Sequence, residues 1–413
     1  MRIVDVLTEP VRAGFFSDDQ AAIRAGAAHD GFGYAGAPHT PGFTEIRQAG
    51  EAVSVLLLLE DGSVAYGDCA AVQYSVAGGR DPVFTASSAC LDIAEQLRPL
   101  LVGAELTSFR ELAGAVDSRP LHTAIRYGVT QAVLDAVAQS RRLTMAEVVR
   151  HEYATGVDLV PVPMFAQCGE DRYTGVDKMI LKRVEVLPHG LINEPATLVG
   201  PRGELFEDYL RWLVGRVGKL GRDGYTPRLH FDTYGTIGLV FDGDVTAVAG
   251  YLARLGELAA PYELVIEHPI DAGSRAAQLD TYRRLRAALR GLGSPVKIAV
   301  DEWCNTLEDI ELFVAGETAD VIHVKTPDLG GITNTIEALL LVRRHGLAAY
   351  CGGTCNETDR SAQVTAHLAM ACAAGQVLAK PGMGVDEGLM IVGNEMARVA
   401  AIAAARSRSL ARS

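Results

Sequence analysis

Four short runs decide the fold of this chain: LHFD at residues 229–232, LVIE at 264–267, KIAVD at 297–301 and VIHVK at 321–325. Each run is apolar and ends on a charged residue, as a buried strand does where it reaches the edge of a sheet. The first three charges are 35 and 34 residues apart (267 minus 232, 301 minus 267), and the fourth follows after 24 (325 minus 301). Each step has room for about one strand and one helix.

The same alternation of strands and helices extends over residues 161–413. Eight such units predict a (β/α)8 barrel, in the α/β class. An open doubly wound sheet is the alternative, but it needs a Gly-rich phosphate turn after its first strand, and the sequence has none. The expected strands are Val160–Phe165, Met179–Val186, Arg228–Phe231, Glu263–Ile266, Lys297–Val300, Val321–Val324, Ala348–Tyr350 and Gln376–Leu378.

Residues 1–160 have a different order, with strands first and helices after them, which predicts a separate α+β domain. A segment rich in Gly, Pro and His, residues 31–42, interrupts the early strands and is either a surface connection or a mobile lid. The expected strands are Met1–Leu7, Val53–Leu59 and Ser63–Tyr66, and the expected helices are Thr85–Leu101, Ser108–Val116 and Leu121–Arg142.

The bulk composition excludes several classes of protein. The formal net charge is -13, which disfavours nucleic acid as a partner because phosphates need clustered Lys and Arg. The seven cysteines are odd in number and irregularly spaced, as free thiols are in a reducing compartment. The most apolar early run, Val53–Leu59, is too short to cross a membrane. We therefore expect a soluble, cytoplasmic protein with no nucleic-acid or membrane partner.

Asp232, Glu267 and Asp301 end three successive barrel strands, so their carboxylates are expected to converge at the rim where barrel enzymes carry their sites. An all-oxygen set of this kind suits Mg2+. Each carboxylate can instead form a local salt bridge or cap the next helix. Lys325 ends the fourth strand, beside the expected cation, so we predict a lowered pKa and a role as general base. The alternative is a surface lysine at a strand end.

Other polar residues also follow expected strands. Gln167 and His189 come after the first two, and either can serve the fold rather than the site. Thr354 and Cys355 follow a later strand and offer a hydroxyl and backbone N–H groups to an anionic substrate, or else form an ordinary tight turn.

Several motifs resemble one known family, the methylaspartate ammonia-lyases (3-methylaspartases) of the enolase superfamily. The resemblance covers essentially the whole chain. The motifs are VQYSVAGGRD (72–81), LPHGLIN (187–193), FDTYG (231–235), IEHP (266–269), DEWCN (301–305), KTPDLGG (325–331), CGGTCNET (351–358) and KPGMGVDEG (380–388).

The resemblance implies an N-terminal capping domain before the barrel, and elimination of ammonia from 3-methylaspartate to give mesaconate. It implies that Asp232, Glu267 and Asp301 hold Mg2+. Lys325 and His189 would be bases on opposite faces of the substrate. It also implies K+ stimulation, a homodimer and a place in glutamate degradation. Residues matching substrate contacts or pocket walls are Gln73, Gln167, His189, Thr354, Cys355 and Leu378.

One residue departs from the family pattern. His323 stands two residues before Lys325, where the family usually has Gln. Both side chains can donate a hydrogen bond to a carboxylate, so His323 is assigned to substrate binding, but His can also carry a charge.

Two other functions stay open at this point. Another enolase-superfamily enzyme acting on a different carboxylate would share the three acids, although such enzymes often carry a Lys-x-Lys pair, and Lys182-Arg183 lacks that spacing. A barrel that binds a ligand without chemistry is the second alternative.

Overall fold

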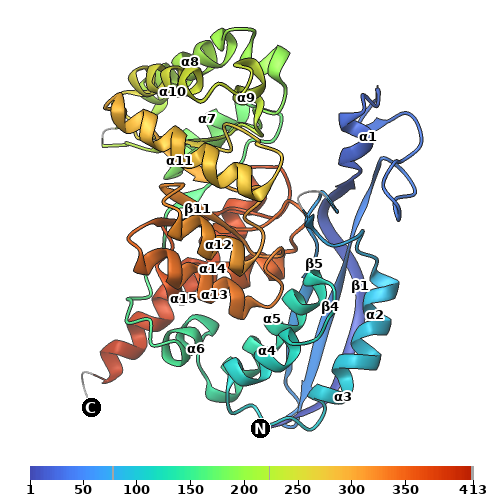
Figure 1. The fold of residues 1–413 in the computed structure, drawn as a ribbon. Helices are drawn as coiled ribbons and strands as arrows, with labels where there is room; N and C mark the ends of the chain where they lie inside the picture. Colours follow the sequence, from blue (N-terminus) through green and yellow to red (C-terminus); the bar gives the residue numbers. More distant parts are fainter. Residues whose placement is uncertain (77–78, 223, 411–413) are drawn as a thin grey trace.

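The structure is a computed structural model that describes residues 1–76, 79–222 and 224–410. Two parts lie side by side in Figure 1: an N-terminal part of long strands and helices in blue and cyan, and a C-terminal barrel in green to red. The fold therefore confirms the α+β part followed by a barrel. The predicted domain limits, 1–160 and 161–413, stay a prediction, and the first barrel strand begins at Met164.

The N-terminal sheet is antiparallel, in the order β1-β4-β5. Helix α5 (Thr123–Arg141) lies along this sheet and is buried over most of its length. The two approach closely at Gly128, where an added Cβ would stand 2.3 Å from the backbone nitrogen of Cys69. Only glycine fits there, so this residue sets the spacing between helix and sheet. The strands are β1 (Ile3–Asp18), β4 (Arg47–Leu59) and β5 (Val64–Ala70).

The eight C-terminal strands close into a parallel barrel in the order β10-β11-β12-β13-β6-β7-β8-β9. Since sequence neighbours are also neighbours in space, the C-terminal ends of all strands meet at one rim. The strands are β6 (Met164–Phe165), β7 (Val186–His189), β8 (Arg228–Asp232), β9 (Leu264–Glu267), β10 (Lys297–Val300), β11 (Val321–Lys325), β12 (Ala348–Gly352) and β13 (Gln376–Leu378).

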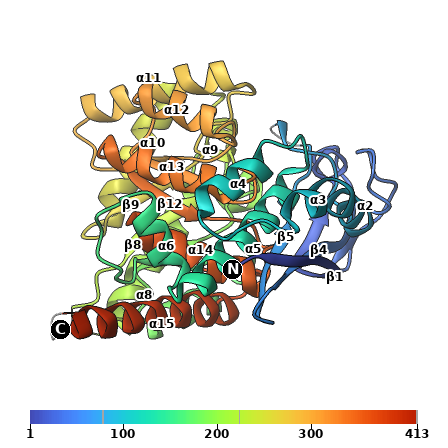
Figure 2. The ribbon, with the colours of Figure 1, turned by 90° about the horizontal axis from the view of Figure 1, so that it is seen from below.

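Helices surround the barrel and cover the N-terminal sheet (Figures 1 and 2). The remaining helices of the N-terminal part are α1 (Gln20–Arg24), α2 (Ala86–Asp92), the π-helical turn η2 (Ile93–Leu97), α3 (Arg98–Leu101), α4 (Phe109–Asp117) and α6 (Met145–Glu152). Those of the barrel are α7 (Thr174–Leu181), η3 (Pro195–Val199), α8 (Glu204–Leu220), α9 (Thr236–Val240), α10 (Val245–Ala259), α11 (Arg275–Gly291), α12 (Leu307–Ala315), α13 (Ile332–Arg344), α14 (Asp359–Cys372) and α15 (Asp386–Leu410).

The predicted strand at Met179–Val186 is wrong. Residues 174–181 form helix α7 instead, because Val176, Met179 and Ile180 recur at helical spacing and bury one face. The second barrel strand, β7, begins only at Val186. The first strand is also shorter than expected and covers Met164–Phe165 alone.

Residues 31–42, expected to be a surface connection or a mobile lid, include part of a small hairpin. Strand β2 (His29–Asp30) pairs with β3 (Gly33–Tyr34) beside helix α1. Figure 1 shows this segment beside α1, at the upper end of the N-terminal sheet, and its residues Phe32 and Tyr34 line a large cavity.

Helix α15 is long and apolar enough to cross a membrane, by length and composition alone, over Asp386–Ser409. The core helix of a globular protein passes the same test, so this is weak evidence for a membrane span. Near its end, Arg406 donates hydrogen bonds to Glu147 and to the carbonyl of Arg142, which tie the helix to the N-terminal part. All seven cysteines are free thiols, as the sequence predicts.

Candidate active site

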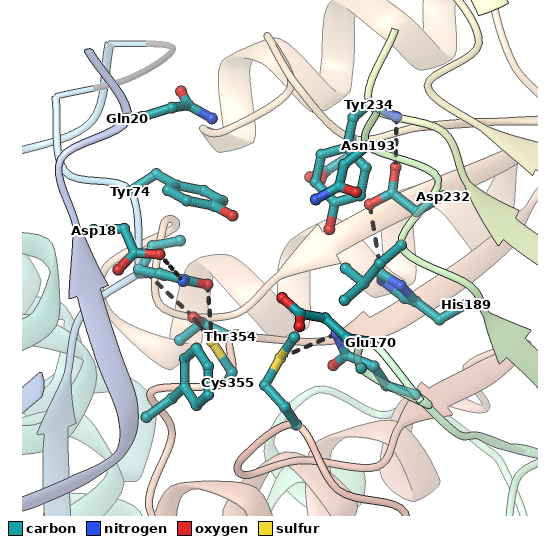
Figure 3. A pocket seen from close by; sticks show the side chains of 18 of the residues that line it. Asp18, Gln20, Tyr74, Glu170, His189, Asn193, Asp232, Tyr234, Thr354 and Cys355 are labelled. Atoms are coloured by element: carbon teal, nitrogen blue, oxygen red, sulfur yellow. Dashed lines mark hydrogen bonds and ion pairs between the residues drawn. The ribbon is translucent and has the colours of Figure 1, made fainter. Parts of the chain in front are cut away.

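A cavity of about 800 Å³ lies where the N-terminal part meets the barrel rim. Figure 3 shows its walls: Asp18 and Tyr74 from the N-terminal part lie with Thr354 and Cys355 on one side, and His189, Asp232 and Tyr234 on the other. Among the predicted residues, Gln73, Gln167, His189, Asp232, Asp301, His323, Lys325, Thr354, Cys355 and Leu378 line this cavity. Glu267 lies within hydrogen-bonding distance of the lining residue His323.

The three predicted metal ligands stand on adjacent strands and are buried. Asp232 pairs with Glu267 in the barrel register, and Asp301 directly follows β10. Burial raises the pKa of Asp232 well above its usual range, and the charges of Glu267 and Asp301 raise it further. The protein side chains thus leave negative charge here under-compensated. A divalent cation with oxygen ligands fits this donor set.

Lys325 forms an ion pair with one of the predicted metal ligands. Its Nζ lies 2.7 Å from Oδ2 of Asp301, in an ion pair closed off from solvent. Burial lowers the lysine pKa, but the Asp301 carboxylate outweighs burial and raises it. The predicted lowering depends on a cation bound beside Lys325 and stays a prediction, while the Asp301 carboxylate holds the ammonium proton in this ion pair.

Glu267 is held between two histidines. Nε2 of His230 lies 2.9 Å from Oε2, and Nδ1 of His323 lies 3.1 Å from Oε1. Burial alone would raise the pKa of Glu267, but these hydrogen bonds lower it to about 2. Burial lowers the pKa of His323, but the carboxylates of Asp301 and Glu267 raise it to about 9. Both acids are thus held as carboxylates.

His189 stands at the end of β7 with a left-handed backbone, φ 67°. Burial lowers its pKa to about 3, so the imidazole is neutral at pH 7. Its Nε2 lies 3.8 Å from Oδ2 of Asp232. A neutral imidazole can accept a proton, and β7 and β11 are four strands apart in the closed barrel, so His189 and Lys325 face each other across it.

Gln167 has a partner that the sequence reading missed. The amide oxygen of Gln167 accepts a hydrogen bond from Lys380, which is buried and lines the cavity. Burial lowers the pKa of Lys380. Its position two residues after β13 was the available signal, because other rim residues also follow strand ends.

A second missed group comes from the N-terminal part. Buried Asp18 accepts hydrogen bonds from Nε2 of Gln73, at 2.7 Å, and from Arg47, at 2.7 and 2.8 Å. Because a carboxylate only accepts, the amide nitrogen of Gln73 must face Asp18. The amide oxygen of Gln73 accepts a hydrogen bond from the Cys355 thiol at 3.1 Å, and the backbone N–H of Gln73 donates to the Thr354 hydroxyl.

Arg80, within the motif at residues 72–81, reaches into the barrel. It pairs with Asp328 at 2.9 Å and Glu302 at 3.0 Å, next to the strand ends that carry Asp301 and Lys325. The N-terminal part thus supplies charge as well as a wall to the site.

Comparison with known proteins gives one consistent result. Residues 1–154 match the family described as methylaspartate ammonia-lyase N-terminus, and residues 156–405 match methylaspartate ammonia-lyase C-terminus. The chain is 53% identical to the methylaspartate ammonia-lyase of Clostridium tetanomorphum over 98% of this chain and 100% of that one.

Solved structures agree. The Mg complex of β-methylaspartase from Clostridium tetanomorphum matches with a TM-score of 0.95 and 53% identity, covering 98% of this chain and 100% of that chain. The Citrobacter amalonaticus methylaspartate ammonia-lyase containing (2S,3S)-3-methylaspartic acid matches with a TM-score of 0.95 and 48% identity. The match covers 97% of this chain and 99% of that chain. The L-Ala-D/L-Glu epimerase of Bacillus subtilis shares the fold, with a TM-score of 0.64 and 16% identity. The match covers 94% of this chain and 91% of that chain.

Proposed function

The chain belongs to the methylaspartate ammonia-lyase family, and on this premise we propose how its site eliminates ammonia from 3-methylaspartate to give mesaconate. In this reaction the C3–H bond breaks and its proton goes to a base. The electron pair left behind is held as negative charge on C3 and the carboxylate next to it. As the C2–N bond breaks, this pair forms the C2=C3 double bond, and the C2–N electron pair leaves with ammonia.

Asp232, Glu267 and Asp301 would hold Mg2+, which the family structure with Mg supports. When bound, the cation supplies positive charge that stabilises the negative charge developing on the substrate carboxylate next to C3. With the cation bound, Asp301 would hold the Lys325 proton less tightly, and the free amine of Lys325 would become accessible as a base.

Lys325 and His189 would remove the C3 proton from opposite faces, because their strands face each other across the barrel. Lys325 serves the (2S,3S) substrate and His189 the C3 epimer. Burial keeps the His189 imidazole neutral, so one ring nitrogen has a lone pair that can accept the proton.

The remaining side chains would bind the rest of the substrate. The oxygen of Gln73 is an acceptor suited to the substrate ammonium group, because the amide nitrogen is already engaged by Asp18. The carboxylate on C2 would meet Gln167, Thr354 and Cys355, with buried Lys380 as a nearby positive charge. Leu378 forms an apolar wall.

The segment at residues 31–42 would act as a lid. Phe32 and Tyr34 line the cavity, and the Arg47 guanidinium lies 4.6 and 5.1 Å from the centres of their rings. Substrate binding should therefore slow limited proteolysis of this segment. Equal cleavage with and without substrate would count against a lid.

Three wider assignments rest on family membership alone: a homodimer, stimulation by K+, and a role in cytoplasmic glutamate degradation. Sedimentation equilibrium tests the dimer. Activity with K+ replaced by Na+ at constant ionic strength tests the ion.

The observation that carries the function is the row of acids on three adjacent strands with Lys325 on the next. Its test is ultraviolet absorbance after 3-methylaspartate and Mg2+ are added, since mesaconate is conjugated and its precursor is not. We expect a rise that is lost in Asp232→Asn. No rise with 3-methylaspartate, aspartate or other 3-substituted aspartates would refute the function.

A further inference from the structure

His323 is held rigidly inside the barrel. It lies on β11 two residues before Lys325, so both side chains leave the same face of the strand. The His323 ring stacks on Tyr350 with centroids 3.8 Å apart and planes 10° apart, and the residue is 3% exposed. Its Nε2 lies 3.2 Å from the carbonyl oxygen of Gly352. A carbonyl only accepts, so Nε2 carries a hydrogen.

This contact decides what Nδ1 can do. With the hydrogen on Nε2, the neutral ring has its lone pair on Nδ1. Nδ1 is 3.1 Å from Oε1 of Glu267 and 3.1 Å from Oδ1 of Asp301. Adjacent ligands of an octahedral ion, each about 2.1 Å from it, are about 3 Å apart. The two observed distances match the edges of such a site, and one ligand atom from each of the three residues lies within 4.8 Å of the others.

The second oxygen of each acid is already engaged. Oδ2 of Asp301 accepts from Lys325 at 2.7 Å, and Oε2 of Glu267 contacts His230 at 2.9 Å. His230 is oriented by Gln376, whose Nε2 lies 2.8 Å from its Nδ1 while the Gln376 oxygen accepts from Arg228. Gln376 therefore donates to Nδ1, and Nε2 of His230 donates to Glu267. The two remaining oxygens, Oε1 of Glu267 and Oδ1 of Asp301, are the ones that face His323.

We propose that Nδ1 of His323 is a direct nitrogen ligand of the divalent cation, beside Glu267 and Asp301. On binding, any proton on Nδ1 leaves to solvent and its electron pair is donated to the ion. The inference deepens the proposed function and rests on its metal site. Imidazole favours later divalent transition ions, so this site should bind Mn2+ and Co2+ over Mg2+ more strongly than three carboxylates alone would.

The alternative is a ring that only donates hydrogen bonds to the two acids. Electron spin-echo spectroscopy of the full-length protein loaded with Mn2+ distinguishes the two, because only a directly bound nitrogen gives strong hyperfine coupling. Histidine labelled with 15N identifies the nitrogen as imidazole. The variant His323→Gln keeps a polar side chain, and His230→Gln is the matched control, since His230 reaches Glu267 from the other side.

We expect imidazole coupling in the unmodified protein and in His230→Gln, and its loss in His323→Gln. Calorimetry should show Mn2+ affinity falling by about tenfold or more in His323→Gln, with a smaller fall for Mg2+. Absence of coupling in the unmodified protein, which needs no variant, overturns the inference, as does coupling that persists in His323→Gln. Coupling without any mesaconate formation would defeat the proposed function and leave the ligand assignment standing.

Discussion

Glu357 should make the protein less stable as the pH rises. Its side chain is 1% exposed, and its Oε1 accepts hydrogen bonds from Tyr127 at 2.8 Å and Thr326 at 2.9 Å. Burial raises its pKa from 4.5 to about 7, although both hydrogen bonds oppose the shift. Between these pH values the folded protein binds more protons than the unfolded chain, so the free energy of unfolding falls as the pH rises.

A shift of this size corresponds to about 3 kcal/mol. Glu357→Gln keeps the accepting oxygen but cannot ionise. Its free energy of unfolding, relative to the unmodified protein, should therefore rise by up to about 3 kcal/mol between pH 4.5 and pH 8. Urea unfolding followed by circular dichroism at several pH values measures this difference, with exposed Glu95→Gln as the control. A difference for Glu357→Gln that stays constant across this range would refute the reasoning.

Three further predictions concern the amine site, packing and the metal. In Asp18→Asn, the Gln73 amide is no longer held in one orientation. The KM for ammonia in the reverse reaction should therefore rise roughly tenfold, while the KM for mesaconate changes little. A parallel rise in both KM values would instead indicate general disruption of the site. Gly128→Ala places a Cβ within 2.3 Å of the Cys69 backbone nitrogen. We expect the free energy of unfolding, measured with urea, to fall by about 1–3 kcal/mol. An unchanged unfolding midpoint would contradict the close packing. Because Mg2+ binds only the folded site, adding it should raise the melting temperature, and chelation should reverse the rise. The control is Asp232→Asn, whose melting temperature should not change on adding Mg2+. An unchanged melting temperature in the unmodified protein would count against the site.

Much of the barrel could be predicted from the sequence, because its strands are short apolar runs with a charge at the end. Lys297–Val300 and Gln376–Leu378 were predicted with the bounds they have. The failure at Met179–Val186 has a physical cause: a short apolar run has the composition of a strand or of a buried helix face, and only the packing of α7 separates the two.

The site was partly predictable for a related reason. Residues at strand ends, such as Asp232 and Lys325, meet at the rim whatever the exact side-chain positions are. Asp18 could not be found this way, because its role depends on contact between two parts of the chain far apart in sequence. The raised pKa of Lys325 could not be predicted either, because it depends on which carboxylate lies nearest to the amine.

The central claim is that Lys325 and His189 act as bases on opposite faces of one substrate. Its most direct test measures kcat/KM of Lys325→Ala and His189→Ala with (2S,3S)- and (2S,3R)-3-methylaspartate. Lys325→Ala should lose about 10²- to 10⁴-fold with the first isomer and keep much of its activity with the second, and His189→Ala should do the reverse. Equal loss of both activities in both variants would contradict the account.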